Sequence, residues 1–180
     1  MKPRGTMMIE HRLIEKMLDI VKKELAVIEK TKSVNPVFID TVVDFIKIYA
    51  DRTHHGKEED ILFRELEKKK MNAGDKKMMR DLVEEHITAR KVVGELVEAN
   101  RRYAGGDLSG LKIISEKLKF LIDFYPVHIR KEDMEFFPKT EKYFSSDELE
   151  AMLDEFWEFD RKMIHEKYNR LYDSLIKNYS

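Results

Sequence analysis

Residues 54–63 read HHGKEEDILF and residues 128–137 read HIRKEDMEFF, so the chain contains one pattern twice. Each copy begins with a histidine, has a glutamate four residues later and ends on phenylalanine. Residues four apart lie one above the other on a single face of an α-helix. Two such faces turned toward each other bring two imidazoles and two carboxylates to one point. The pattern therefore predicts a helical protein with a metal site, and two carboxylates suit a pair of metal ions.

The composition of the 180 residues favours one ordered helical domain, because 42% of them are hydrophobic and 38% are charged. Acidic and basic residues are interspersed and leave a net charge of −1, so no basic surface is expected to bind nucleic acid or a membrane. No stretch approaches the roughly 18 apolar residues of a membrane-spanning helix, and the first residues lack the apolar core of a signal peptide. We expect a cytoplasmic protein.

The chain contains no cysteine, which excludes disulfides, thiolate zinc sites, cysteine-ligated iron–sulfur clusters and a cysteine nucleophile. Any metal must therefore be held by nitrogen and oxygen ligands. Six histidines and many carboxylates are available for that role.

The apolar periodicity predicts five helices and no β-strand. We expect one domain over 1–180, in which four helices form an up-and-down bundle over about 6–140. A fifth, C-terminal helix follows over about 145–178. The expected helices cover about residues 6–30, 36–70, 76–103, 109–137 and 145–178.

Several residues predict where these helices begin, end or bend. Asn35 is expected to cap the second helix and Asp75 the third, while Pro138 marks the end of the fourth. The capping box Ser145–Glu148 opens the fifth. Gly56 lies in the middle of the second helix, where glycine is unfavourable by ~1 kcal/mol relative to alanine. That position indicates a close approach to the backbone or an irregularity in the helix.

Each of the first four predicted helices has one histidine on its apolar stripe, and two of them add a glutamate one turn later. An ionised glutamate that faces a core is unfavourable unless it is paired or bound to a cation, and two would repel each other. A pair of metal ions resolves both problems, because each carboxylate can bridge the two ions. The predicted ligands are His11, His54, Glu58, His86, His128 and Glu132.

The ordinary interpretation of each residue taken alone is different. A single histidine on a helix stripe is more often a hydrogen-bonded core residue, and a single histidine–glutamate pair four apart usually lies on the surface. Six such residues on four helices in a repeated context favour a metal site. Imidazole and carboxylate ligands together suit iron or manganese.

The order of these residues resembles the hemerythrin-like HHE cation-binding domain family, in its bacterial and archaeal branch. The resemblance rests on residues 10–12, 51–63, 85–86 and 128–138, and it extends to residues 164–168. It implies a four-helix bundle that holds two iron ions bridged by an oxo or hydroxo group, with manganese or zinc as substitutes.

By position in this family, Glu58 and Glu132 would be the bridging carboxylates and the four stripe histidines the terminal ligands. One departure concerns the invertebrate oxygen carriers, which have a second histidine one turn after the histidine of the third helix. This chain has Arg90 there, so the geometry of an oxygen carrier is not expected.

Two other histidines are candidates for the missing ligand. On a regular helix His55 lies about 100° round from His54, at the edge of the core, and a related eukaryotic iron-sensing protein has a ligating glutamate at the equivalent place. Its alternative role is that of an outer or surface histidine. His165 lies on the fifth helix and could reach a metal or a bound water if that helix covers the bundle. Its alternative role is an ordinary hydrogen bond.

The resemblance implies a protein that binds, senses or scavenges a small ligand such as O2, NO or H2O2 at the carboxylate-bridged centre. Two alternatives stay open: a di-iron oxidoreductase that reduces peroxide or NO, and an iron-handling protein. The fold does not choose between a binding protein and an enzyme, and the residues indicate no protein partner.

Overall fold

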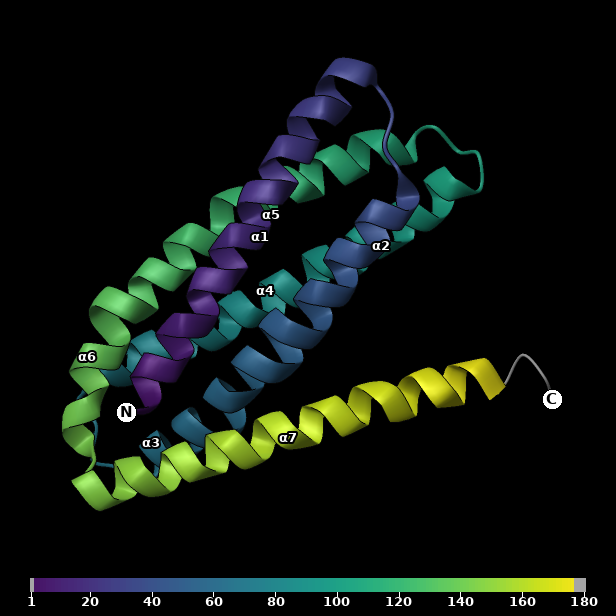
Figure 1. The fold of residues 1–180 in the computed structure, drawn as a ribbon. Helices are drawn as coiled ribbons and strands as arrows, with labels where there is room; N and C mark the ends of the chain where they lie inside the picture. Colours follow the sequence, from purple (N-terminus) through teal and green to yellow (C-terminus); the bar gives the residue numbers. More distant parts are fainter. Residues whose placement is uncertain (1, 177–180) are drawn as a thin grey trace.

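The computed structural model describes residues 2–176, and within them it contains helices and no strand. Four long helical runs form an up-and-down bundle, and a fifth long helix lies outside it (Figure 1). The all-α fold predicted from the sequence is confirmed. In chain order the elements are α1 (Pro3–Thr31), α2 (Pro36–Phe45), η1 (Ile46–His55), η2 (Glu58–Phe63), α3 (Arg64–Glu67), α4 (Ala73–Ala104), α5 (Gly110–Lys131), η3 (Glu132–Phe136), α6 (Phe137–Thr140), η4 (Glu141–Tyr143) and α7 (Ser146–Ile176).

The second helix of the bundle is the continuous run from α2 to α3, and the fourth is the run from α5 to α6. The predicted C-terminal helix is α7, and its last expected residues, 177–178, lie outside the described residues. In the part of the chain that the structure describes, no helix is both long and apolar enough to cross a membrane.

The apolar faces of the bundle helices form two buried clusters, one on each side of the predicted histidines. On α1, Met7 belongs to one cluster and Ile14 to the other, and His11 lies between them. The cluster that contains Met7 also includes Phe156 of α7. The predicted site is therefore enclosed by apolar side chains along the bundle axis, which keeps water away from it.

Two of the expected helix boundaries are confirmed by their hydrogen bonds. The side chain of Asn35 accepts a hydrogen bond from the backbone N–H of Val37 at 3.0 Å, as a helix cap does. Ser145 and Glu148 exchange the two hydrogen bonds of a capping box at the start of α7, at 2.9 and 3.2 Å.

Two other boundaries were predicted wrongly. The cap of α4 is Asn72, whose Oδ1 accepts a hydrogen bond from the backbone N–H of Asp75 at 2.8 Å, so Asp75 lies within the first turn. Pro138 does not end the fourth bundle helix. It lies near the start of α6, directly after η3 and inside the continuous helical run, which goes on to Thr140.

Three π-helical segments interrupt the regular helices at the two repeated motifs. η1 ends at His55, η2 begins at Glu58 and η3 begins at Glu132. Gly56 lies between the first two segments, and a Cβ there would approach Cζ of Phe159 to 2.8 Å. Both parts of the expectation for this glycine are confirmed, because the helix is irregular and α7 approaches its backbone closely.

α7 packs against η1, η2 and α1 and runs obliquely to the bundle (Figure 1). Arg64 forms an ion pair with Glu155 of α7 at 2.7 Å on the surface. Lys57 is completely buried, and it forms an ion pair with Asp160 of α7 at 2.7 Å. The second ion pair joins α7 to a residue directly beside the predicted site.

Candidate metal centre

The six side chains predicted as ligands lie together inside the bundle. Each bundle helix contributes one imidazole, and the first residues of η2 and η3 contribute the carboxylates. None is more than 2% exposed. The set is His11, His54, Glu58, His86, His128 and Glu132.

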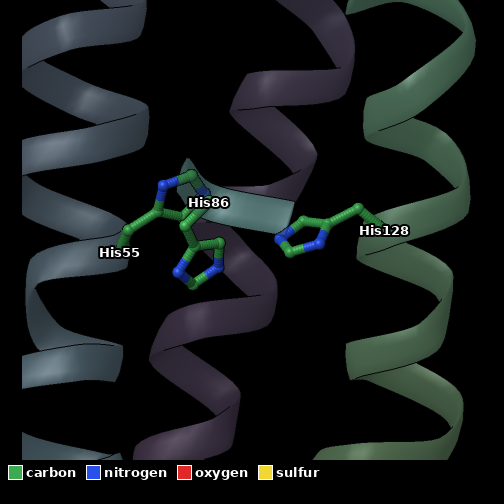
Figure 2. Close-up of side chains that lie close together, drawn as sticks. All are labelled: His55, His86 and His128. Carbon is green, nitrogen blue, oxygen red and sulfur yellow. The ribbon is translucent and has the colours of Figure 1, made fainter. Parts of the chain in front are cut away.

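A seventh side chain joins them, and the seven form two groups in which the ligand-type atoms lie within 4.8 Å of one another. The first group is His11, His54, Glu58 and Glu132. The second group, which converges from three helices in Figure 2, is His55, His86 and His128.

The two glutamates of the first group also face the histidines of the second group. Oε1 of Glu58 faces Nε2 of His54 at 3.7 Å, and Oε2 faces Nε2 of His86 at 3.3 Å. Glu132 likewise directs one oxygen at the histidine of α1 and the other at the histidine of α5, at 3.2 and 3.3 Å. Each carboxylate therefore has one oxygen for each group, which is the arrangement of a bridging ligand.

His55 lies inside the site and not at its edge. Its ring is 1% exposed and stacks on the ring of His86, with the centroids 3.8 Å apart and the planes at 11°. The expected offset from His54 assumed a regular α-helix. A π-helical turn contains more residues, so adjacent residues are separated by a smaller angle. In η1 both neighbouring histidines consequently face the interior.

The four stripe histidines are oriented by carboxylates behind them. Each donates its Nδ1–H to a carboxylate at 2.7 or 2.8 Å, which leaves the Nε2 lone pair directed into the centre. The pairs are His11 with Asp133, His54 with Glu10, His86 with Glu59, and His128 with Glu85.

Each of these outer carboxylates is held in turn by a basic side chain. The pairs are Asp133 with Arg12 at 2.5 Å, Glu59 with Arg90 at 2.7 Å, Glu10 with Lys57, and Glu85 with Lys131. Arg90 thus helps to orient the imidazole of His86, because it holds the carboxylate of Glu59. Glu10 and Glu85 were not among the predicted site residues, although a glutamate directly before a histidine in both halves of the chain was a usable signal.

Burial and the neighbouring charges shift the pKa values within the cluster. Burial would lower the pKa of His11, but the hydrogen bond to Asp133 and the nearby carboxylate of Glu132 outweigh it and raise the pKa to about 9. Burial lowers the pKa of His54 to about 4. Burial raises the pKa of Glu58 well above its usual range, and the nearby Glu132 carboxylate adds to the rise. Some of these groups hold protons that a bound cation would displace.

The atoms that face the centre have no hydrogen-bond partner among the described residues. They are Nε2 of each stripe histidine and both carboxylate oxygens of Glu58 and Glu132. Buried polar atoms are nearly always paired, and an unpaired one is unfavourable by about 1–3 kcal/mol. Eight such atoms around one point are the donor set of a cation site. The residues present therefore fit a bound metal.

The structure does not bring His165 to this centre. It lies on α7, its side chain is exposed, and it belongs to neither of the two groups. The contacts of α7 with the surroundings of the site are instead made by Phe159 and Asp160, which precede His165 on the same helix.

Buried imidazoles and carboxylates inside a four-helix bundle define a cation-binding helical protein. A family model described as Hemerythrin HHE cation binding domain matches residues 3–140, which is the bundle from the start of α1 to the end of α6. The chain belongs to this family, and the resemblance seen in the sequence is confirmed. Comparison with curated proteins and with solved structures gave no match.

Proposed function

We propose that this protein is a non-haem di-iron protein that binds a small molecule such as O2, NO or peroxide. One observation supports the proposal most strongly. Each of the two buried glutamates directs one oxygen at each of two imidazole groups. Carboxylates in that position can join two cations, and a donor set of imidazoles and carboxylates suits iron or manganese.

In the proposed centre, the two groups of imidazoles hold one iron each and the two glutamates are shared. The ligands would be His11 and His54 for one iron, His55, His86 and His128 for the other, and Glu58 and Glu132 for both. His55 then supplies the nitrogen that the oxygen carriers take from the position of Arg90. Two iron ions supply reversible electron transfer and a coordination position for the small molecule.

The protein itself supplies orientation and the exclusion of water. Rings of phenylalanine flank the imidazoles: Phe137 stacks on His11 with the centroids 6.0 Å apart, and Phe124 stacks on His128 at 5.5 Å. The outer carboxylates keep Nδ1 protonated and hold each ring in place. A closed apolar site of this kind favours small ligands and slows hydrolysis of what is bound.

Anaerobic reduction followed by addition of O2, monitored by visible absorption, tests the proposal. A stable spectrum that reverses when O2 is removed is expected for a binding protein. Repeated turnover of peroxide or NO would favour the oxidoreductase alternative, and release of iron without a ligand spectrum would favour iron handling. A single tightly held zinc ion without a redox response would refute the di-iron proposal.

Substitutions test the ligand assignment separately. His54→Ala and Glu132→Ala should each strongly lower the iron content of the purified protein. His165→Ala is the matched control, because this histidine is exposed and lies outside both groups, and it should leave the iron content unchanged. Full iron content in both ligand variants would show that the assignment is wrong.

A further inference from the structure

His55 is held less firmly than the other four histidines of the centre. Its Nδ1 lies 3.4 Å from Oδ1 of Asp51, whereas the others lie 2.7 or 2.8 Å from their carboxylates. The usual range for such a hydrogen bond is roughly 2.7–3.2 Å. The same oxygen of Asp51 already accepts a hydrogen bond from Nε of Arg90 at 2.8 Å. The His55 ring therefore lacks the strong restraint that the other rings have.

His55 is also the residue that makes the two halves of the site unequal. The halves match at the histidines, the bridging glutamates, the outer carboxylates and the lysines that pair with them. In that alignment His54 corresponds to His128, and His55 corresponds to Ile129, which is a buried apolar residue. The second group thus has one imidazole more than the repeat supplies.

A cavity of about 280 Å³ opens directly onto His55. Among the seven side chains of the centre, His55 is the one that lines this cavity. A water molecule occupies roughly 30 Å³ of the liquid, so a ligand of a few atoms fits in the space. The lining residues are Ile46, Lys47, Ile48, Asp51, Arg52, His55, Ala89, Arg90 and Val93.

The charges around the cavity favour an anion. Lys47, Arg52 and Arg90 are basic and Asp51 is acidic among the lining residues, and Arg90 is paired with Asp51 and Glu59, so the exposed Lys47 is the basic residue on which the preference for an anion is tested. A cleft with a surplus of one charge raises the local concentration of ions of the opposite sign. Apolar residues complete the lining, and the imidazole of His55, which is 1% exposed, lies at the buried edge of the cavity.

We propose that His55 is an exchangeable ligand, and that a small anion enters through this cavity and takes the place of its imidazole beside His86 and His128. The proposal rests on the proposed function, since it requires a metal pair at the centre. It assigns ligand exchange to the second group, whose cavity reaches the surface. His11 and His54 of the first group do not line that cavity.

Substitution of His55 gives the first test, with azide as the probe anion and the iron-loaded protein monitored by visible absorption. His55→Ile introduces the residue of the matching position and leaves the coordination position permanently free. If the displaced state of His55 is populated at roughly 10% or less, its removal should raise the azide affinity about tenfold or more. The iron content of this variant is measured in the same samples, so that azide affinities are compared at known metal loading.

Blocking the cavity gives the second test. Ile48→Trp fills the passage from a half-buried position and should slow azide association about tenfold or more, because entry through an obstructed path is rate-limiting. Ile122→Trp is the matched control at the corresponding half-buried position of the other half, away from the cavity, and should not slow association. Lys47→Glu, at an exposed position, should slow the association of azide and leave that of neutral NO unchanged.

The outcomes separate this proposal from the proposed function. A wild-type protein without a metal pair would refute both. A normal iron pair with unchanged azide affinity in His55→Ile, or with equal association rates in the two tryptophan variants, would refute the exchange proposal alone. Loss of one iron from His55→Ile would also overturn it, because His55 would then be a fixed ligand. Equal effects of Lys47→Glu on azide and NO would refute the preference for anions.

Discussion

Replacing Glu58 with methionine should stabilise the metal-free protein and remove its response to iron. Glu58 is 0% exposed, and neither of its carboxylate oxygens has a hydrogen-bond partner. An unpaired buried polar group is unfavourable by about 1–3 kcal/mol, and methionine has a similar volume. For a chain of this size that gain corresponds to an increase in Tm of roughly 2–12 °C.

The effect of Glu58→Met should grow with pH. Because the folded-state pKa of Glu58 is raised, the folded state binds more protons than the unfolded state at pH values above the ordinary pKa of 4.5. The free energy of unfolding of the wild type therefore falls as the pH rises above that value. The variant lacks this titration, so its advantage should be larger at pH 7 than at pH 5.

Thermal unfolding followed by circular dichroism, with and without iron, measures both effects. Iron at about 100 times its Kd should stabilise the wild type by about 2.7 kcal/mol and the Glu58→Met variant much less, so the gap between them should shrink or reverse. Glu58→Gln is the control, since its amide remains buried and unpaired and should give little of the gain. A metal-free variant that melts below the wild type, or one that iron stabilises equally, would refute the reasoning.

Three further predictions concern the scaffold and the pH dependence of metal uptake. Gly110→Ala should lower the free energy of unfolding by about 1–3 kcal/mol, because the new Cβ would lie 2.6 Å from the carbonyl oxygen of Ala99. Gly94→Ala should raise the free energy of unfolding by up to about 1 kcal/mol, because the space around this glycine is open. Urea unfolding measures both variants, and the same change in Gly110→Ala and Gly94→Ala would contradict the prediction. Lys57→Met should be destabilising by about 1–3 kcal/mol in the same assay, because it leaves the partly exposed carboxylates of Glu10 and Asp160 without their shared cation, and a neutral effect would contradict the assigned ion pairs. Metal affinity measured by calorimetric titration should rise by up to about tenfold per pH unit below pH 9. The reason is that His11, with a pKa of about 9, must lose a proton before it can bind the metal. An affinity that does not change with pH would contradict the assigned protonation of His11.

The bundle and the six side chains at its centre could be predicted from the sequence because both depend on local periodicity. The apolar stripe of each helix determines which face is buried, and the histidines and glutamates lie on those stripes. Once four stripes pack together, the side chains on them must meet. Met7, His11 and Ile14 on α1 illustrate this, since the imidazole lies between members of two buried clusters.

The position of His55 could not be predicted, because the prediction applied regular α-helical geometry to a segment that is π-helical. In η1 the smaller angle between neighbours places His54 and His55 on the same side. The glycine after them was the one local sign of this irregularity. The stacking of His55 on His86 further depends on the packing of two helices, which the spacing within either helix does not contain.

Which imidazole each outer carboxylate orients could not be predicted, for a related reason. Glu10 orients His54 on another helix, and Glu85 orients His128 on another helix. Which imidazole each carboxylate contacts depends on how neighbouring helices are rotated about their axes. The spacing of residues within one helix does not predict that rotation. Boundary errors such as Asp75 arose because Asn72 competes for the same capping role three residues earlier.

The central claim is that two groups of imidazoles and two shared glutamates hold a pair of iron ions. The most direct test is the metal content of protein purified without chelators, measured together with its visible absorption spectrum. The structure leads us to expect about two irons per chain and a spectrum that changes on reduction. One metal ion per chain, or two ions without any redox response, would contradict the claim.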